Sequence, residues 1–311
     1  MGNSAAKERF EKAGKTKILT AEDVKLDDWD DIVKLGKDLP KDVRTFNVAR
    51  NQLKDPLPRK LLELPCVLAT VRVLDLSDNK LADVAALAYG LADFATAPAA
   101  KATGELLRMA AEDSTFKYPL ETLNLAGNRI QALPAFAFLR FPKLKQLNLS
   151  RNALVSPSSP EQIVVCSRVF CGTPSLVSLN LSGNNFIAFP LFATDVASGD
   201  PTSALASLPK LMELDLQGNA LRAVASNGAS LPALKSLDIG GQQDPKSLAS
   251  IDESIFVDFP KMSSLGVEKT ANREKIFGAL HGREAYQAWI RERASDVNRQ
   301  LASGLRGKMA E

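Results

Sequence analysis

LVSLNLSGNNF, residues 176–186, carries the pattern that decides the fold of this chain. Its first, fourth, sixth and eleventh positions are apolar, and its ninth position is asparagine. Leu179 and Leu181 alternate with polar neighbours as in a β-strand, so both side chains face the same side. Asn184 at the ninth position turns the chain away from the strand, and its amide can satisfy buried backbone groups. A unit of this size cannot bury its own apolar face, so it needs neighbours of the same kind.

The chain contains six close copies of this template, LxxLxLxxNxL. Besides residues 176–186 they are VRTFNVARNQL (43–53), VRVLDLSDNKL (71–81), LETLNLAGNRI (120–130), LKQLNLSRNAL (144–154) and LMELDLQGNAL (211–221). A further stretch, LKSLDIGGQQD (234–244), follows the pattern through its sixth position and then has Gln242 in place of the asparagine. The unit resembles the leucine-rich repeat. The resemblance implies an α/β fold, a leucine-rich-repeat solenoid or horseshoe with a concave parallel β-sheet, helical insertions and a C-terminal capping helix.

The ninth-position asparagines are expected to have a structural role between neighbouring coils. They are Asn51, Asn79, Asn128, Asn152, Asn184 and Asn219. The spacing between them is irregular, which predicts insertions, the longest a helical one at about residues 82–115.

Three regions are expected along the chain. Residues 1–38 form an N-terminal lipid-anchor segment and cap, residues 39–270 the solenoid, and residues 271–311 a C-terminal helical cap. KILTAEDVKLDDWDDIVKL (17–35) predicts a short strand and a helix that shield the first coil. A long helix is predicted from about Arg283, because one apolar stripe follows helical spacing. That stripe consists of Tyr286, Ile290, Ala294, Val297, Leu301 and Leu305.

The composition excludes several classes of protein. A net charge of +3 over 311 residues argues against a general nucleic-acid binder. No apolar run is long enough to span a membrane, and no secretory signal is evident. The three cysteines are an odd number without zinc-ligand spacing, which favours a reducing compartment and hence the cytoplasm.

Candidate catalytic or metal-binding residues are scarce. His281 is the single histidine, and it lies in the predicted C-terminal cap. AGKT (13–16) lacks the upstream glycine of a phosphate-binding loop. We therefore predict no enzyme activity, no metal and no cofactor. The alternative is an enzyme that uses one of the cysteines (Cys66, Cys166 or Cys171) or an acidic pair such as Asp27 and Asp28.

The concave sheet face is the predicted protein-binding site, since solenoids usually recognise partners there. The fifth position of each repeat gives a row of short polar side chains: Asn47, Asp75, Asn124, Asn148, Asn180, Asp215 and Asp238. Cations are grouped toward the N-terminal half of this face: Arg44, Arg50, Arg72, Lys145 and Arg151. A solvated sheet face accounts for the polar row equally well. The row has no aromatic anchors, which predicts moderate affinity for a partner.

The first residues, MGNSA, resemble an N-myristoylation signal with the acyl chain on Gly2. Ala6 departs from the serine or threonine preferred at that position. Together with the repeats and with VEKT…REAYQAWIRER (267–293), this start is similar to the leucine-rich repeat-containing protein 57 family. The resemblance implies an N-myristoylated, non-enzymatic, membrane-associated repeat protein. Residues 1–17 contain five cations against two anions, which would assist attachment to an anionic leaflet.

The sequence thus predicts a monomeric adaptor at the cytoplasmic membrane leaflet, which binds a protein partner and no nucleic acid. The alternative is a soluble scaffold or regulatory subunit of a larger complex, such as one built on a phosphatase or the cytoskeleton.

Overall fold

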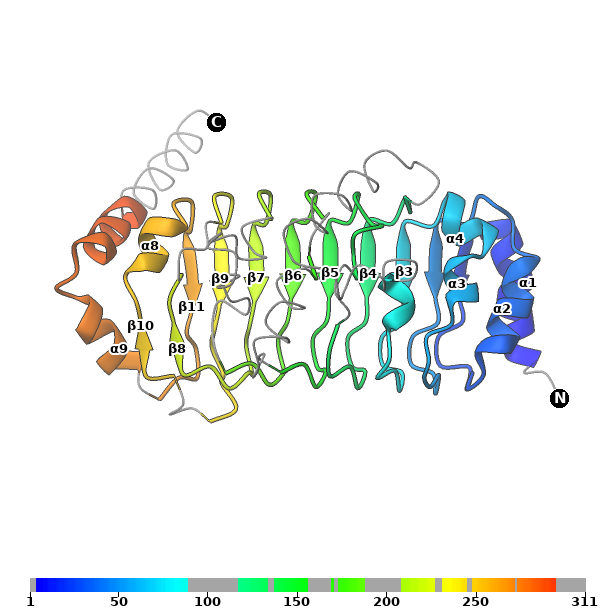
Figure 1. The fold of residues 1–311 in the computed structure, drawn as a ribbon, viewed down its shortest axis with the longest axis horizontal. Coiled ribbons are helices and arrows are strands. Elements are labelled where there is room, and N and C mark those ends of the chain that lie inside the picture. The colour runs from blue at the N-terminus through cyan, green and yellow to red at the C-terminus, as the bar shows by residue number, and fades with distance from the viewer. Residues whose placement is uncertain are drawn as a thin grey trace, which may run out of the picture.

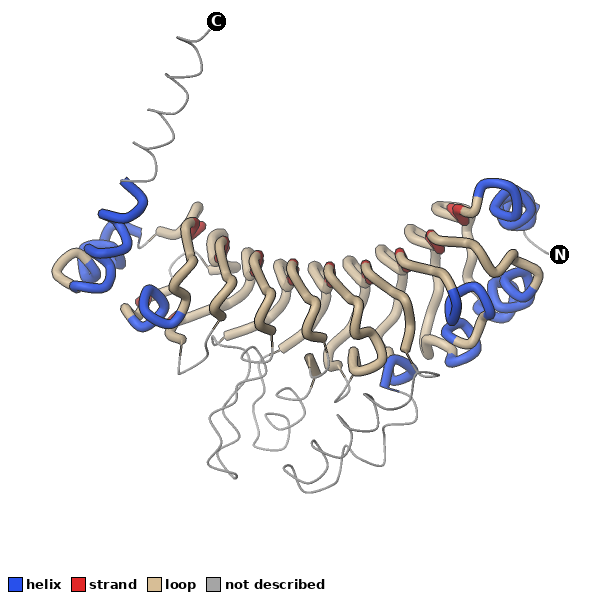
Figure 2. Tube along the Cα trace, turned by 90° about the horizontal axis from the view of Figure 1, so that it is seen from above, coloured by secondary structure: helices blue, strands red, loops and turns tan. Residues whose placement is uncertain are grey.

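The structure is a computed structural model, and it describes residues 4–88, 117–133, 137–155, 169–170, 173–187, 208–226, 231–244, 248–271 and 273–294. Within these residues, nine strands form one parallel sheet whose spatial order follows the chain. They are β1 (Ile18–Thr20), β2 (Thr45–Asn47), β3 (Val73–Asp75), β4 (Thr122–Asn124), β5 (Gln146–Asn148), β6 (Ser178–Asn180), β7 (Glu213–Asp215), β9 (Ser236–Asp238) and β11 (Ser264–Gly266). Figure 1 shows the strands side by side in a row. Figure 2 shows them along the inner side of an arc. The predicted solenoid with a concave parallel sheet is therefore confirmed.

The register of the sheet follows the repeat template. The fourth-position residue of each repeat pairs with the fourth-position residue of the next, as Leu179 does with Leu147 and Leu214. These side chains point into the core, where Leu179 is 1% exposed. Because the strand period is two, a slip of one residue would turn the whole apolar set outward, so the burial fixes the register.

The convex side of the described solenoid contains short elements in place of long helices. They are α3 (Arg59–Leu62), α4 (Pro65–Ala69), the 3-10 helix η1 (Ala85–Ala88), α8 (Ser254–Asp258), and the paired strands β8 (Ala223–Val224) and β10 (Ser250–Ile251). Between the coils of β4 to β6, stacked phenylalanine rings fill the interior, with Phe138 and Phe170 centroids 5.7 Å apart. Of the helical insertion predicted at about residues 82–115, only its start with η1 lies within the described residues.

The N-terminal cap consists of two helices and β1. Helix α2 (Trp29–Lys37) begins at Asp28, whose carboxylate accepts a hydrogen bond from the Asp30 amide at 2.8 Å. This helix and β1 agree with the strand and helix predicted over residues 17–35. Helix α1 (Ser4–Thr16) was not predicted. It buries Ala6, Phe10 and Ala13, and the Phe10 ring meets Phe46 edge to face at 6.2 Å.

The C-terminal cap also contains one helix more than predicted. Helix α9 (Arg273–Leu280) precedes the predicted helix, which covers residues 284–294 in the described part. Tyr286 is buried against Phe256 at 5.2 Å, and Trp289 Nε1 donates to the Met262 carbonyl at 2.6 Å. Ile290 is partly buried and Ala294 is exposed, so the predicted apolar stripe leaves the core there. Its other members, Val297, Leu301 and Leu305, lie outside the described residues.

Candidate protein-binding surface

The ninth-position asparagines lie beneath the candidate surface and connect its coils by hydrogen bonds. Asn79 Nδ2 donates to the carbonyls of Leu76 and Ser77 in its own coil and of Val48 in the preceding coil, each at 3.1 Å. Its Oδ1 accepts from the Leu53 amide at 3.1 Å. The same pattern recurs at Asn51, Asn128, Asn152, Asn184 and Asn219. Each side chain thereby joins two coils through backbone groups that would otherwise be buried without partners.

We call this series of hydrogen bonds between coils the asparagine ladder. It continues past Asn219 through Gln242. Its Nε2 donates to Ile239 at 2.7 Å, and its Oε1 accepts from the Leu221 amide at 2.9 Å. The longer amide therefore does what the asparagine does elsewhere. In the last coil Thr270 takes the ninth position, and within the described residues its buried Oγ1 has no hydrogen-bond partner. Threonine has no amide with which to reach both coils, so the ladder ends there.

The fifth-position row, predicted as partner-binding, caps the strand ends. Asn47, Asn124, Asn148 and Asn180 each accept with Oδ1 from the amide two residues later, for example from Ser182 at 2.9 Å. Asp75, Asp215 and Asp238 accept the same bond from Ser77, Gln217 and Gly240. One oxygen of each side chain thus has a structural role. At Asp75 and Asp238 the second oxygen also accepts a hydrogen bond, from Asn124 and from Gln217.

The eighth position has left-handed backbone in every coil. Glycine occupies it at Gly127, Gly183, Gly218 and Gly241, with φ between 55° and 65°. Other residues occupy it with φ between 51° and 59°, namely Asp23, Arg50, Asp78, Arg151 and Lys269. L-residues adopt this conformation at a cost of about 1 kcal/mol or more. The large side chains at this position therefore stand where glycine would be the less strained choice.

Ion pairs link the N-terminal coils across the concave face. At the start of the strands, Glu121 pairs with both Arg72 at 2.6 Å and Lys145 at 2.7 Å. Hydrogen bonds from Lys145 and Arg72 hold the pKa of Glu121 below its ordinary value. Arg50 pairs with Glu22 at 3.2 Å.

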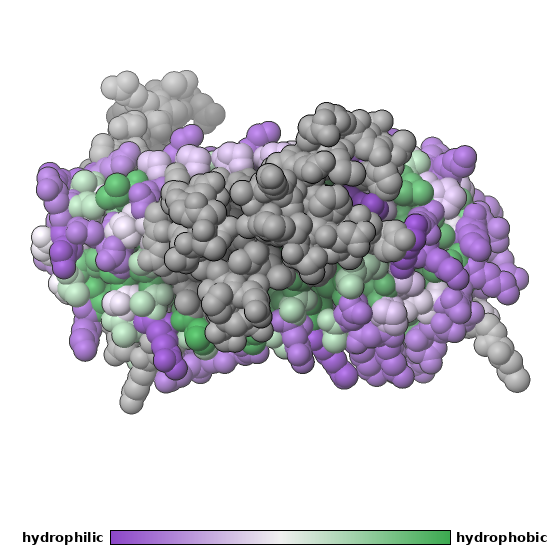
Figure 3. All heavy atoms as spheres, viewed as in Figure 1, coloured by the Kyte–Doolittle hydropathy of each residue, from purple (hydrophilic) through white to green (hydrophobic). Residues whose placement is uncertain are grey.

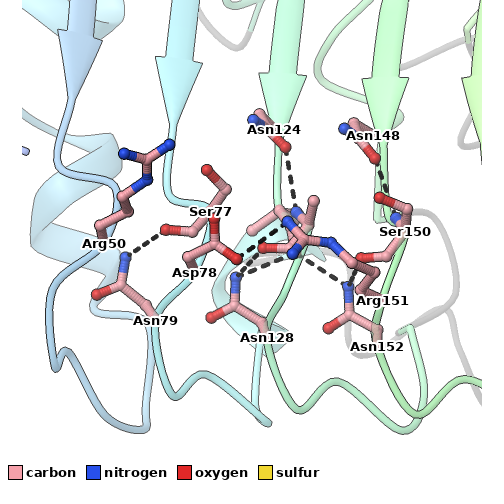
Figure 4. Close-up of polar contacts among 12 residues, drawn as sticks. Arg50, Ser77, Asp78, Asn79, Asn124, Asn128, Asn148, Ser150, Arg151 and Asn152 are labelled. Carbon is pink, nitrogen blue, oxygen red and sulfur yellow. Dashed lines mark hydrogen bonds and ion pairs between the residues drawn. The ribbon is translucent and has the colours of Figure 1, made fainter. Parts of the chain in front are cut away.

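A further pair lies at the ends of the strands and spans one intervening coil. The Arg151 guanidinium meets Asp78 at 3.0 Å (Figure 4). Gly127 belongs to the intervening coil, and both side chains lie close to it. A Cβ on Gly127 would lie 2.0 Å from Asp78 Oδ1. Gly127 is thus required both for its positive φ and for the close approach of this ion pair.

The C-terminal coils carry carboxylates without such pairing. Asp215 and Asp238 lie directly opposite each other in the register of β7 and β9. Within the described part of the chain, neither takes part in an ion pair, and Gln217 Nε2 donates to Asp238 Oδ2. Burial raises the pKa of Asp215, and the neighbouring Asp238 charge raises it further.

The predicted site residues therefore separate into two groups. Four of the predicted cations lie on the concave face but form ion pairs: Arg50, Arg72, Lys145 and Arg151. Their acidic partners, which were not predicted, are Glu22, Asp78 and Glu121. These acids occupy the second, seventh and eighth positions of their own repeats, so aligning the repeats side by side would have brought opposite charges together. Arg44 is exposed, and no ion pair within the described residues includes it. Gly2 lies outside the described residues.

No catalytic arrangement is found in the described residues. Cys66 is buried, and burial raises the pKa of its thiol, which disfavours the reactive thiolate. Cys166 and Cys171 lie outside the described residues. Asp27 and Asp28 lie at the start of α2, where Asp28 is the helix cap. The described residues hold no metal-binding cluster of histidine, cysteine or acidic side chains, and none of their helices is long and apolar enough to cross a bilayer.

Comparison with known proteins supports the repeat assignment. Residues 118–186 match a family model for the leucine-rich repeat, and residues 67–88 match a second one. The mouse (Mus musculus) protein named transforming growth factor beta activator LRRC32 is 31% identical over 138 residues, and its Pongo abelii counterpart is 32% identical over 134 residues. These alignments cover 40% and 39% of this chain, which spans about a fifth of the length of the two relatives.

A solved structure supports the fold over most of the chain. The crystal structure of Listeria monocytogenes InlP superposes with a TM-score of 0.51 and 17% identity, covering 83% of this chain and 57% of that one. At this identity the likeness concerns the fold alone. The repeat matches, the hydrogen-bonded asparagine ladder and the curved parallel sheet together show that this chain contains leucine-rich repeats and has the fold of a leucine-rich-repeat solenoid.

Proposed function

We propose that this protein is a non-enzymatic adaptor that binds a protein partner on the concave face of its solenoid. The observation that carries the proposal is the uneven neutralisation of charge along that face. Four of the five cations of the N-terminal half are bound to acids by ion pairs, and Arg44 is the exception within the described residues. The adjacent carboxylates Asp215 and Asp238 have no such cation.

Two carboxylates opposite each other at Asp215 and Asp238 lower the stability of the fold, and the fold does not need both charges. Like charges directly opposite each other on neighbouring strands are destabilising. An asparagine would accept the same turn hydrogen bond without a charge, as Asn180 does on the neighbouring strand. Two aspartates at this place are therefore better explained by a cation that a partner supplies.

The surroundings of the two aspartates suit an extended basic segment. The eighth position beside them is glycine in three successive coils, at Gly183, Gly218 and Gly241. Without side chains there, the backbone of a partner can approach the sheet closely. We therefore propose that the partner contributes lysine or arginine to the C-terminal half of the concave face, with moderate affinity because aromatic anchors are absent.

A display selection with short random peptides tests this proposal. Peptides selected on the wild-type protein should be enriched in lysine and arginine. They should lose at least about tenfold in affinity for the double variant Asp215→Asn/Asp238→Asn, since desolvated charge pairs carry such differences. Asparagine keeps the turn hydrogen bond, so the variant should fold normally.

Asp75→Asn is the matched control for this experiment. Asp75 occupies the same repeat position, but its neighbours in the register are Asn47 and Asn124, so no second carboxylate lies opposite it. This variant should bind the selected peptides like the wild type. Selected peptides without basic residues, or equal binding to the double variant, would place the site elsewhere.

We further propose that the adaptor is cytoplasmic and attached to the membrane through a myristoyl chain on Gly2. One such chain binds membranes only marginally, so a second signal is needed. Helix α1 supplies candidates, since Lys7, Arg9, Lys12 and Lys15 are exposed on it. Each basic residue near an anionic leaflet contributes about 1 kcal/mol. Figure 3 shows hydrophilic side chains gathered at the end of the molecule where α1 and α2 lie.

Intact mass and membrane fractionation of wild type and Gly2→Ala, expressed in eukaryotic cells, test the anchor. We expect the mass of a myristoyl group on the wild type, and loss of membrane association in the variant. An unmodified N-terminus with both forms soluble would instead support the soluble scaffold or regulatory subunit.

A further inference from the structure

A cleft of about 250 Å³ lies between the two helices of the N-terminal cap. It exists because α1 and α2 bury their main apolar faces separately, α1 with Ala6, Phe10 and Ala13 and α2 with Ile32 and Val33. At Gly14 no side chain fills the space between the helices, and an added Cβ would lie 3.8 Å from Pro40 Cγ. The gap is therefore a consequence of glycine at this position of α1.

The lining of the cleft is mostly apolar. Phe10 and Gly14 contribute from α1, and Leu35, Leu39 and Pro40 contribute from the end of α2 and the turn after it. Leu35 and Pro40 are only partly buried. The charged lining residues on α1 are Lys7 and Glu11, which pair with each other at 4.0 Å. The third charged lining residue, Asp38, directly follows α2. All three charged side chains are exposed, so an apolar ligand would cover the hydrophobic surface beside charges that already contact water.

The cleft begins beside the N-terminus of the described chain. Helix α1 starts at Ser4, and its residues 7, 10, 11 and 14 follow one face along the cleft. At a rise of 1.5 Å per residue, Gly14 lies about 15 Å from Ser4. A group attached two residues before Ser4 is therefore within reach of this face, and a saturated acyl chain is long enough to follow it.

We propose that the cleft between α1 and α2 receives the acyl chain attached to Gly2. This inference rests on the proposed acylation. The acyl chain is then bound either in the cleft or in the bilayer. The free energy of its binding in the cleft therefore reduces the free energy of membrane attachment. The cap thereby sets how readily the adaptor leaves the membrane.

The test uses the full-length protein co-expressed with an N-myristoyltransferase, with acylation verified by intact mass. Gly14→Leu places a side chain in the cleft, and Gly14 has no positive φ that would strain the substitution. We expect acylated Gly14→Leu to bind vesicles of phosphatidylcholine and phosphatidylserine about tenfold more tightly than the acylated wild type. In the absence of vesicles, nuclear Overhauser contacts between a ¹³C-labelled acyl chain and Phe10 or Leu39 should be present in the wild type and lost in the variant.

Ala5→Leu provides the matched control, because Ala5 is exposed on the same helix and does not line the cleft. It introduces the same leucine side chain and should leave vesicle affinity unchanged, as should both substitutions in the unacylated protein. Equal affinities for acylated Gly14→Leu and Ala5→Leu, or an acyl chain without contacts to the cleft, would overturn the cleft proposal and leave the anchor standing. A Gly2 that the transferase leaves unmodified would overturn both.

Discussion

At the scale of single residues, two positions of the repeat template are explained by what the backbone needs there. The eighth position needs a left-handed residue, which explains why Gly127, Gly183, Gly218 and Gly241 recur there. The sequence shows only that these residues are small. Arg50, Asp78, Arg151 and Lys269 conceal the requirement because the template tolerates their strain. The ion pairs of Arg50, Asp78 and Arg151 partly offset this backbone strain.

The ninth position can be tested by removing one amide. Asn184 is fully buried, and its side chain holds hydrogen bonds to Leu149, Leu181, Ser182 and the Leu154 amide. Asn184→Ala leaves these groups buried without partners, so we expect the free energy of unfolding to fall by about 3 kcal/mol. Asn180→Ala removes the two hydrogen bonds that the Ser182 amide and hydroxyl donate to it within one turn, and it should cost about 1 kcal/mol. Urea denaturation of both variants measures the difference, and equal losses would show that the ladder has no special weight.

The charge of Asp215 should appear in the pH dependence of stability. Its pKa is raised by burial and by Asp238, so the folded protein binds this proton more tightly than the unfolded chain does. The resulting stability is present at low pH and is lost as the pH rises through the raised pKa. Asp215→Asn should therefore be more stable than wild type at pH 7, by at most about 1 kcal/mol because the site is half-exposed.

The difference between Asp215→Asn and wild type should disappear as the pH falls below about 3.9, the ordinary pKa of aspartate. Thermal denaturation over this pH range gives the measurement. A variant less stable than wild type at pH 7 would mean that the hydrogen bonds from the Gln217 amide and the Ser182 side chain outweigh the cost of burying the charge.

At the scale of elements, the strands follow from the repeat template, whereas the cap helices do not. Each strand has the same apolar pattern as its neighbours, so burial of that pattern sets both the strand and its register. Helix α1 has only Ala6, Phe10 and Ala13 as an apolar face among charged residues. Such a face is too narrow to identify a helix from sequence, and its partner surface on the first coil becomes known only once the solenoid is built.

The packing of α1 makes a prediction about the cap. Phe10 is 5% exposed and its ring contacts Phe46. Phe10→Ala should lower the stability of the cap by about 3 kcal/mol. Amide hydrogen exchange should then be much faster over residues 4–16 than in the strands β4 to β6, because the cap can open without the solenoid. Lys12→Ala, on the exposed face of the same helix, is the control and should leave exchange unchanged.

At the scale of the whole molecule, the solenoid is defined by contacts between neighbouring coils and not by the length of chain between them. Asn79 and Asn128 are 49 residues apart, yet β3 and β4 pair in the same register as β4 and β5, whose asparagines are 24 residues apart. The fold was therefore predictable from the six close copies alone. The charge pattern of the candidate site was not, because it depends on which side chains meet across coils. Arg151 and Asp78 are 73 residues apart in sequence.

This independence from loop length gives a prediction for the longest insertion. Deleting residues 90–114 would give Asn79 and Asn128 the same separation as Asn128 and Asn152. Every described contact between the coils of β3 and β4 lies outside the deletion, including the hydrogen bond from the Leu81 amide to Asn128 Oδ1 at 3.1 Å and the ion pair of Arg72 with Glu121. Since a shorter loop also loses less entropy on closure, the deleted protein should fold cooperatively and lose less than about 2 kcal/mol of stability. Chemical denaturation followed by circular dichroism measures this, with Asn128→Ala as a comparison that breaks the same junction. If the deletion destabilises the protein as much as Asn128→Ala does, the insertion is part of the core, and the coil contacts alone are not sufficient to hold the two halves of the solenoid together.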